Sequence, residues 1–407
     1  MTSARGRTIL FLGAGRHQRR AIRRVGELGA RVVAVDRSAS APGFEDADEG
    51  EAVDFTDVDA VVEVARRHGV DGVMTMASDR AVPIVAAVAE TLGLPGIGSE
   101  TAHLMTNKVA MRRRLAESGV AQPQFAAVRT VHEAHAAVAT VGLPAVLKPS
   151  DSSGQRAIFR IASTDELDAH LHAAIAESPT HEAILESFHD GVEVNALLVA
   201  RGGAPSVVTL SDRRRPDGRG FGVALDHVYP STFFGDVLEE LHRVAVHAVK
   251  ALGLRDGIAY PQLLACGDGV VRVVEVAARI PGGQMGELAR LAVGVDLVEV
   301  AVLQALCHEV PDELVEPRFQ HPLAIHFLTA EPGTLPTGTV KTVGSLEKVL
   351  AFPGVVAADL YLQVGETIRP VQRDGDRRGY VIARGDTNLE ALERAAAAAK
   401  LVDVVVE

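Results

Sequence analysis

Glu275, Arg279, Gly282 and Gly283 are the most informative group of residues in the chain, because each type suits one task in phosphate chemistry. Glu275 stands at the end of an apolar run that predicts a strand over residues 270–276. A carboxylate supplies the oxygen ligands that Mg²⁺ prefers, and a planar guanidinium can bind two oxygens of a carboxylate or phosphate. Glycine lets backbone N–H groups approach a substrate closely. The pattern favours magnesium and phosphate chemistry, although a Glu–Arg pair by itself is more often a surface ion pair.

Lys148 ends a second apolar run, residues 145–148, and a small-residue loop with Ser152, Ser153 and Gly154 follows it. A lysine at a strand end can neutralise phosphates, and backbone N–H groups of such a loop can surround an anion. The spacing is not that of a P-loop. A strand followed by a Pro-Ser-Gly turn is also common without any ligand.

Residues 184–194 predict a strand, a crossing segment and a second strand, with acids on both sides. Such a hinge could bond an adenine edge through its backbone while Phe188 packs near the ring and Glu193 binds ribose hydroxyls. The alternative is an ordinary hairpin with solvated acids.

The loop Gly13-Ala14-Gly15 lies between a predicted strand and a predicted helix, as in a dinucleotide-binding fingerprint. Its third glycine position is Gln18, and Asp36 ends the next strand where a ribose-binding acid would stand. An NAD-dependent oxidoreductase is therefore an alternative. Tight strand-to-helix turns need glycine anyway, and no hydride-transfer site is evident downstream.

Composition narrows the possible partners. The formal net charge of −12 argues against nucleic acid, whose binders are basic. Four Tyr and no Trp leave few stacking platforms for single strands. Two cysteines are too few for a disulfide framework, and no apolar run approaches a membrane span. With no signal-peptide pattern at Met1, we expect a cytoplasmic protein without membrane or nucleic-acid partners.

The 407 residues exceed what one core usually supports. In the first hundred residues, strands at 8–12, 31–35 and 72–76 alternate with helices at 18–28, 58–67 and 81–92, which predicts a parallel doubly wound sheet. A linking helix at 107–118 follows. We expect an α/β (α+β) protein with units at 1–106, 107–182, 183–330 and 331–407, the last being a small α+β unit.

The order of these features resembles the ATP-grasp superfamily over nearly the whole chain. The order is Lys108 in Asn-Lys-Val-Ala-Met, Lys148, the Ser/Gly loop, the 186–193 hinge, Gln262, Glu275 and Arg279. Within that superfamily, Glu275-Val-Ala-Ala-Arg279 followed by Pro281-Gly-Gly is most similar to the bacilysin-synthetase-type L-amino-acid ligases. The resemblance implies an ATP-grasp fold, with a Rossmann-like N-terminal domain, an A subdomain, a central subdomain and a closing C-terminal subdomain over the four ranges above.

The resemblance also implies roles for individual residues. ATP would be bound by Lys108, Lys148, Ser152, Ser153, Gly154, Glu186, Ser187, Phe188, His189 and Glu193. Magnesium, which Mn²⁺ could replace, would be held by Gln262 and Glu275. Arg279, Gly282 and Gly283 would bind the carboxylate and stabilise the acyl intermediate. Arg213, His227 and Tyr229 are candidates for the substrate pocket.

Two positions depart from the family pattern. Gln262 replaces the usual first magnesium acid, and Ala277 replaces an asparagine, as it does in the amino-acid ligase branch. Full two-metal occupancy is therefore open, with Asp226 or Glu193 as further candidate ligands.

The resemblance implies a reaction that joins a small-molecule carboxylate to an amine through an acyl phosphate and releases ADP and phosphate, and an amino acid is the expected source of the carboxylate. The two substrates are not encoded in these motifs. Homodimers are common in this family. Two alternatives remain open: a purine-type or carboxylase-type ligase that activates a small acid, and a nucleotide-binding regulatory protein with a degraded site.

Overall fold

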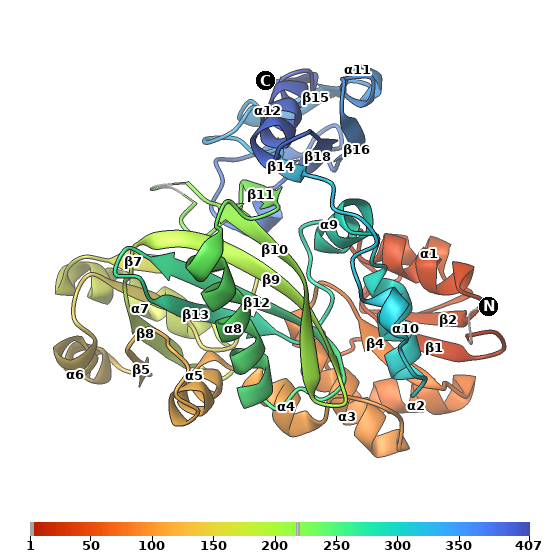
Figure 1. Ribbon diagram of the computed structural model, residues 1–407, viewed down its shortest axis with the longest axis horizontal. Coiled ribbons are helices and arrows are strands. Elements are labelled where there is room, and N and C mark those ends of the chain that lie inside the picture. Colours follow the sequence, from red (N-terminus) through yellow and green to blue (C-terminus); the bar gives the residue numbers. More distant parts are fainter. Residues whose placement is uncertain (1–3, 217, 219) are drawn as a thin grey trace.

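The computed structural model describes residues 4–216, 218 and 220–407, and in these ranges the strands form four sheets (Figure 1). The mixture of helices and strands confirms the α/β (α+β) prediction. In the described ranges, no helix has both the length and the apolar character that crossing a membrane requires.

The N-terminal sheet is parallel, with strand order β3-β2-β1-β4. Its strands are β1 (Thr8–Leu12), β2 (Arg31–Asp36), β3 (Glu49–Ala52) and β4 (Gly72–Thr75). Helices α1 (Arg19–Glu27), α2 (Val58–His68) and α3 (Val82–Leu92) cover it. Strand β3 was not predicted, because its largely exposed Glu-Gly-Glu-Ala sequence has no apolar pattern.

A linking segment leads to a small antiparallel sheet with order β5-β8-β6-β7. Its strands are β5 (Phe125–Val128), β6 (Ala145–Pro149), β7 (Phe159–Ile161) and β8 (Ala183–Ser187). The helices of this region are α4 (Ser99–Leu104), α5 (Lys108–Glu117), α6 (Val131–Val141) and α7 (Thr164–Glu177). Helix α5 begins at Lys108 because the Asn107 side chain accepts the N–H of Ala110 and caps it.

The largest sheet has eight strands in the order β13-β12-β9-β10-β11-β14-β18-β16. They are β9 (Gly191–Arg201), β10 (Ala204–Arg214), β11 (Asp226–Tyr229), β12 (Gly257–Cys266), β13 (Val271–Ala277), β14 (Leu323–Phe327), β16 (Val355–Leu360) and β18 (Gly379–Arg384). The chain on both sides of residue 330 therefore contributes to one sheet.

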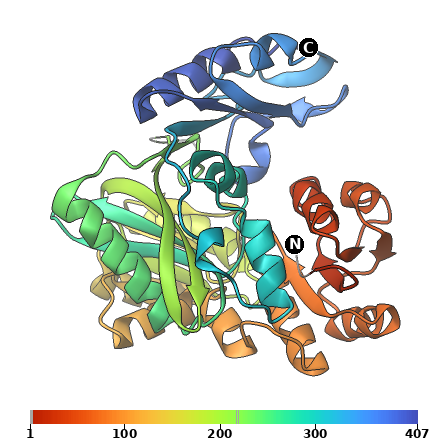
Figure 2. The ribbon, with the colours of Figure 1, turned by 45° about the vertical axis from the view of Figure 1, so that its right-hand side comes forward.

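The helices around this sheet are α8 (Gly235–Ala251), α9 (Met285–Ala292), α10 (Leu297–Ala305), α11 (Glu347–Leu350) and α12 (Asn388–Ala399). A small sheet of β15 (Gly338–Val343), β17 (Thr367–Ile368) and β19 (Val404–Val406) completes the C-terminal unit. This unit lies above the rest of the molecule in both ribbon views (Figures 1 and 2).

The two faces of strand β9 pack against different cores, because successive side chains point to opposite faces. Val194, Ala196 and Leu198 join a cluster with α8. Leu197 and Val199 instead join the cluster that also contains α9, α10 and strands of the N-terminal unit. The face that carries residues 193, 195 and 197 is therefore turned toward the N-terminal unit.

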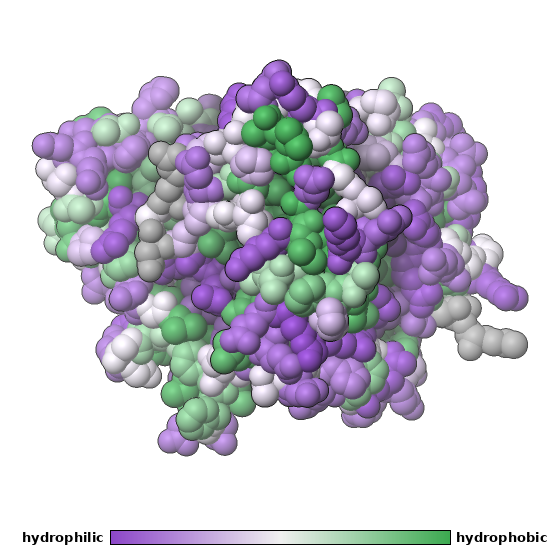
Figure 3. All heavy atoms as spheres, turned by 90° about the horizontal axis from the view of Figure 1, so that it is seen from above, coloured by the Kyte–Doolittle hydropathy of each residue, from purple (hydrophilic) through white to green (hydrophobic). Residues whose placement is uncertain are grey.

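Apolar side chains are also found on the surface of the C-terminal unit. Leu350, Val364 and Leu389 are 50%, 70% and 61% exposed. Seen from above, green hydrophobic atoms lie in the middle of this face among hydrophilic ones (Figure 3).

Leu288→Ala tests the shared core. Leu288 of α9 is fully buried in the cluster that joins the N-terminal unit to the large sheet. We expect a loss of about 2–5 kcal/mol from lost contacts and a cavity, measured as a lower midpoint of urea unfolding. The exposed Leu389→Ala serves as the control and should change stability by less than about 0.5 kcal/mol. Equal effects of the two variants would contradict this core assignment.

Candidate active site

Oxygen-bearing side chains form a row across four neighbouring strands of the large sheet. The register places Ser211 of β10 opposite Asn195 of β9, Asn195 opposite Gln262 of β12, and Gln262 opposite Glu275 of β13. Directly opposite residues point to the same face, with Cβ atoms roughly 5 Å apart. Both predicted metal ligands, Gln262 and Glu275, therefore lie side by side on the face turned toward the N-terminal unit.

A β-bulge and a buried arginine fix this arrangement. The β12–β13 register shifts between Gln262 and Leu263, which leaves Val274 as the extra residue before Glu275. The guanidinium of Arg112 donates to the carbonyl oxygens of Val273 (2.9 Å) and Val274 (2.7 Å). Bulges re-aim the neighbouring side chains, so Arg112 holds the backbone that directs Glu275.

Arg112 also organises the two predicted phosphate lysines. Its Nε donates to Glu186 Oε1 at 2.8 Å, and Lys148 Nζ lies 2.8 Å from Glu186 Oε2. Lys108, four residues before Arg112 on α5, lies on the same helix face. Its Nζ donates to the Ser152 carbonyl at 2.8 Å and lies 3.3 Å from Glu275 Oε1. Arg112, Glu186 and the two lysines therefore meet beside Glu275, at the end of the row of oxygen-bearing side chains.

Burial and charge set the protonation of this cluster. Burial would raise the pKa of Glu186, but the Arg112 and Lys148 cations outweigh it and lower the pKa to about 2. Burial lowers the pKa of Lys148, although Glu186 opposes the shift. Glu186 is thus an ionised structural partner of Lys148.

The Ser/Gly loop contacts three separate parts of the chain. Ser152 meets Lys108 through its carbonyl, and the Ser153 side chain hydrogen-bonds Asp79 of the N-terminal unit. The Gly154 carbonyl accepts the backbone N–H of Asp374, from the C-terminal unit, at 3.1 Å. The predicted phosphate loop therefore closes over the site between the N- and C-terminal units.

The predicted adenine hinge is partly occupied by internal contacts. The N–H of Ser187 donates to Gln124 at 2.9 Å and that of Phe188 to Pro144 at 3.0 Å. The guanidinium of Arg160 lies 4.2 Å from the Phe188 ring, and His189 Nε2 lies 3.0 Å from Ser187 Oγ. An adenine edge would therefore have to bond other backbone groups of this segment.

Glu193, the predicted ribose acid, is paired with two arginines. Arg213 contacts one carboxylate oxygen, and Arg215 Nε lies 2.8 Å from the other. A role in ribose binding would require one of these pairs to open.

Arg279 is fixed by a residue that sequence reasoning missed. Its Nε and one terminal nitrogen donate to the two carboxylate oxygens of Asp79 at 2.7 and 2.6 Å. Burial would raise the pKa of Asp79, but Arg279 outweighs it and keeps this pKa below its ordinary value. The remaining terminal nitrogen, NH1, is buried and has no hydrogen-bond partner within the described residues. The pair leaves Arg279 with one donor group to spare.

The predicted substrate residues His227 and Gly283 come together with an arginine of the C-terminal unit. A Cβ built on Gly283 would lie 3.4 Å from Phe327, 3.5 Å from His227 Nε2 and 3.6 Å from Arg377. Arg377 lies 4.3 Å from the centre of the Phe327 ring and forms a 3.3 Å ion pair, without hydrogen-bond geometry, with Asp374. Glycine at 283 therefore keeps open a space, the substrate chamber, that these three side chains border.

His227 is buried and hydrogen-bonded to Asn195, a member of the row of oxygen-bearing side chains. Its Nδ1 lies 3.0 Å from Asn195 Nδ2. Burial, followed by repulsion from Arg213 and Arg377, holds the pKa of His227 well below its ordinary value. With the Asn195 amide donating to Nδ1, the proton of this neutral ring is on Nε2, beside Gly283.

The remaining predicted residues lie in different surroundings. Arg213 lies opposite His227 in the β10–β11 register, so both point to the face that carries the site. Tyr229 is buried in the apolar cluster shared with the N-terminal unit. A Cβ built on Gly282 would lie 3.3 Å from the Cβ of Ala77, in the N-terminal unit.

Asp226 is not placed as a metal ligand, and this alternative was wrong. It precedes His227 in β11 and so points to the opposite face of the sheet. There its carboxylate lies 2.6 Å from His326 Nδ1. Glu193 is on the correct face but is held by its two arginines.

The row nevertheless fits a magnesium ion. Magnesium takes carboxylate and amide oxygens, usually with water. Glu275 supplies a carboxylate, Gln262 an amide oxygen, and Asn195 Oδ1 is a buried oxygen without a hydrogen-bond partner among the described residues. No group of three or more His, Cys, Asp or Glu in the described ranges could hold a metal, so amide oxygens would have to contribute. Asn195 is a ligand candidate that its apolar strand sequence concealed.

The N-terminal glycine loop is held by internal contacts. Asp36 Oδ2 accepts the N–H of Ala14 at 2.9 Å, and Gln18 donates to the Met76 carbonyl at 2.9 Å. His17 packs edge-on against Tyr361 of the C-terminal unit, with ring centres 5.5 Å apart. The acid that suggested ribose binding therefore supports the loop itself.

Glu186→Gln tests the buried cluster by its pH dependence. A carboxyl whose pKa is lowered from 4.5 to about 2 adds stability above pH 4.5 and loses it as the pH falls toward 2. We expect the variant to lose about 3–5 kcal/mol at neutral pH, because two buried cations lose their partner. Its unfolding midpoint should also vary less than wild type across that acidic range. The exposed Glu313→Gln is the control, and a wild-type pH profile in Glu186→Gln would contradict the assignment.

Family models match three successive parts of the chain. "ATP-grasp N-terminal domain" matches residues 25–96, and "Carbamoyl-phosphate synthase L chain, ATP binding domain" matches residues 107–312. "L-amino acid ligase C-terminal domain 2" matches residues 326–407. The second match alone covers half of the 407 residues.

Two relatives are similar to this chain over most of its length. An uncharacterized protein, y4rH of Sinorhizobium fredii, is 28% identical over 81% of this chain and 68% of its own. A formate-dependent phosphoribosylglycinamide formyltransferase of Ignicoccus hospitalis is 28% identical over 97% of this chain and 96% of its own.

Among solved structures, L-amino acid ligase from Bacillus licheniformis superposes with a TM-score of 0.83 at 20% identity, covering 99% of each chain. At this identity the superposition establishes the fold. The family match, the fold and the converging lysines and acid rule out the oxidoreductase alternative: this chain belongs to the ATP-grasp superfamily of ADP-forming carbon–nitrogen ligases.

Proposed function

We propose that this protein joins the carboxylate of an amino acid to an amine through an acyl phosphate, using ATP and Mg²⁺ and releasing ADP and phosphate. The observation that carries the proposal is the position of Lys108 Nζ, between the Ser152 carbonyl of the loop (2.8 Å) and Glu275 Oε1 (3.3 Å). A phosphate-binding cation, a covering loop and a metal-binding acid meet there.

The first step needs charge neutralisation and positioning more than covalent help. A carboxylate oxygen attacks the γ-phosphorus, the bond to the β-phosphate oxygen breaks, and ADP leaves. Lys108 and Lys148 offset the negative charge of the transferring group. A magnesium ion held by Glu275, Gln262 and Asn195 would add Lewis-acid neutralisation when bound.

In the second step the amine attacks the acyl carbon, and phosphate leaves with its bonding electrons and takes up the proton that the nitrogen loses. Negative charge develops on the carbonyl oxygen in the tetrahedral intermediate. NH1 of Arg279 has no partner in the described chain and is the donor we assign to this oxygen, together with backbone N–H groups at Gly282 and Gly283. Asp79 orients Arg279 for this task.

Acyl phosphates hydrolyse, so the site must exclude water. The Gly154–Asp374 hydrogen bond joins the loop to the C-terminal unit and supports such a closed state. We assign loop opening to substrate entry and product release.

An amino acid substrate is favoured by the C-terminal unit. Residues 326–407 match the L-amino acid ligase C-terminal domain 2, and this segment supplies Phe327 and Arg377 to the chamber. A guanidinium beside a neutral imidazole and an aromatic ring can bind a small polar acid with an apolar side chain.

A ligase of the purine type, activating a small acid such as formate, is the second candidate. Its support is the relative in Ignicoccus hospitalis, which aligns along nearly its whole length. That relative's name describes a phosphoribosyl substrate, so release of ADP with formate and phosphoribosylglycinamide would favour it. The regulatory alternative rests on Gln262 alone.

Glu275→Gln tests the metal assignment. Wild type is incubated with ATP, Mg²⁺ and a matrix of amino acids and amines, formate and phosphoribosylglycinamide included, while ADP is measured and condensation products are sought by mass spectrometry. We expect ADP release that requires one carboxylate–amine pair, and a fall of at least about 100-fold in Glu275→Gln from lost charge neutralisation. The exposed Glu347→Gln is the matched control. Near-normal ADP formation in a folded Glu275→Gln would contradict the metal role.

Arg377→Met tests carboxylate binding by the C-terminal unit. Because a hydrogen bond to a charged group contributes about 1.5–3 kcal/mol, KM for the carboxylate substrate should rise roughly tenfold or more. KM for ATP should stay within about twofold, since Arg377 contacts Phe327 and Asp374 rather than the residues assigned to ATP. Arg369→Met, an exposed arginine of the same unit, is the control. An unchanged carboxylate KM in Arg377→Met would place the substrate elsewhere.

A further inference from the structure

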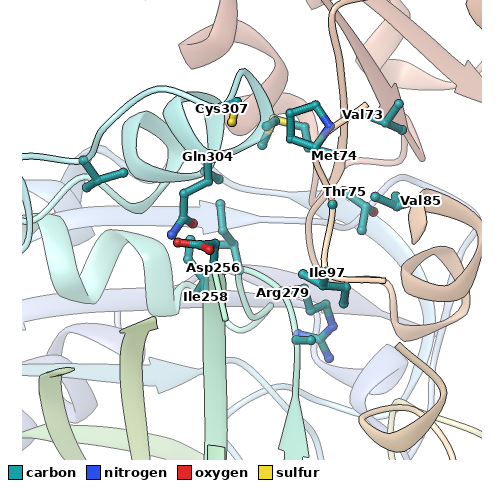
Figure 4. Close-up of a pocket in the computed structure, with 18 of the residues that line it drawn as sticks. Val73, Met74, Thr75, Val85, Ile97, Asp256, Ile258, Arg279, Gln304 and Cys307 are labelled. Carbon is teal, nitrogen blue, oxygen red and sulfur yellow. The ribbon is translucent and has the colours of Figure 1, made fainter. Parts of the chain in front are cut away.

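A cavity lined in part by Arg279 lies between the N-terminal unit and the large sheet (Figure 4). Its volume is about 690 Å³, within the range of small-molecule sites. Val73, Thr75 and Val85 of the N-terminal unit lie on one side, and Asp256, Ile258 and Gln304 on the other. None of the residues assigned to ATP or magnesium lines it.

The cavity combines an apolar wall with unpaired donors. Its lining includes Val73, Met74, Val82, Val85, Ile97, Ile258 and Ile280. Among the lining side chains, Arg201 Nε, His308 Nε2 and Arg279 NH1 are buried atoms with no hydrogen-bond partner in the described part of the chain. Leaving such atoms unpaired costs about 1–3 kcal/mol each, so a ligand that accepts hydrogen bonds from them would be stabilised.

Negative charge lies at the exposed rim. Asp256 and Glu309 both line the cavity and are exposed. Two arginines line the cavity, and each is already balanced: Arg201 by Asp312, 2.6 Å away, and Arg279 by Asp79, also 2.6 Å away. A simple anion would therefore meet net repulsion, whereas a zwitterion could direct its carboxylate to Arg201 and His308 and its ammonium to the rim acids.

We infer that this cavity is a second ligand site, for a small zwitterion with an apolar body: an aliphatic amino acid or a short apolar peptide. The inference is independent of the reaction proposed above, since it concerns binding at a cavity that none of the residues assigned to ATP or magnesium lines.

The walls connect the cavity to catalysis. Arg279 and Ile280 line it, and Met76, directly after β4, forms a parallel bridge with Ile280. Asp79, three residues beyond Met76, holds the guanidinium of Arg279. A ligand that separates or clamps these two wall segments would change the Asp79–Arg279 pair, so the site would act as a regulator of turnover.

Direct binding without ATP tests the inference. The probes are L-leucine and L-leucyl-L-leucine, with 4-methylpentanoate and 3-methylbutylamine as analogues that lack one charge, all followed by isothermal titration calorimetry. We expect one of the two zwitterions to bind and the single-charge analogues to bind at least about tenfold more weakly, because one charged hydrogen bond is lost. The stronger of L-leucine and the dipeptide identifies the source of the ligand.

Variants locate the binding. Arg201→Met removes an unpaired donor and Ala301→Phe fills the cavity from α10; each should weaken binding at least about tenfold. Arg243→Met, an exposed arginine of α8, and Arg377→Met, at the proposed carboxylate site, should leave it unchanged. Binding that survives both cavity variants, or that Arg377→Met abolishes, would overturn the inference, as would no binding of either zwitterion to wild type.

Cys307 offers a readout that does not depend on activity. It is exposed and lines the cavity, and Cys266 is the other free thiol. In a Cys266→Ser chain, the bound zwitterion should slow alkylation of Cys307 in proportion to occupancy. An alkylation rate that saturating ligand leaves unchanged would place the ligand elsewhere.

Discussion

The proposed active site depends on the buried guanidinium of Arg112. It is 1% exposed, and its hydrogen bonds join α5, strand β8 of the four-stranded antiparallel sheet and the bulge of β13. Through Glu186 it fixes Lys148, through the bulge it directs Glu275, and through its own helix it positions Lys108. A buried charge is stabilising only when its partners satisfy it, and here every partner carries or positions a group that ATP chemistry requires. The free-energy cost of burying Arg112 is therefore offset only when the site has the arrangement in which all these partners are in place.

In the proposed site, substrate selection would be spread over more distant segments. The N-terminal unit supplies Asp79, the large sheet supplies Asn195 and His227, and the C-terminal unit supplies Arg377. Because these units meet at the site, small movements between them would change the substrate chamber while the Arg112 cluster stays intact. This division agrees with a superfamily whose members share the handling of ATP and differ in the acid and amine that they join.

Sequence reasoning found the local signals and missed those that depend on sheet register. Glu275, Lys148 and the Ser/Gly loop follow apolar strands, so their spacing and order were sufficient to place them on one site, and the α/β class followed from alternating apolar runs. Asn195 sits inside an apolar strand, and only the pairing of β9 with β12 shows that it faces Gln262. Asp79 and Arg377 lie 200 and 98 residues from Arg279, and no local pattern marks them. Asp226 was considered as a metal ligand because it is a carboxylate, whereas the alternation of side chains along β11 turns it to the opposite face of the sheet.

The most direct test of the account is the fate of the carboxylate oxygen. The protein would be incubated with ATP, Mg²⁺, amines and a pool of amino acids labelled with ¹⁸O in their carboxylates, and the released phosphate analysed by mass spectrometry. An acyl phosphate mechanism predicts one ¹⁸O atom transferred from the acid into phosphate for each amide formed. Phosphate released during turnover with no label from the acid would show that the carboxylate never attacks ATP, and would contradict the proposed reaction.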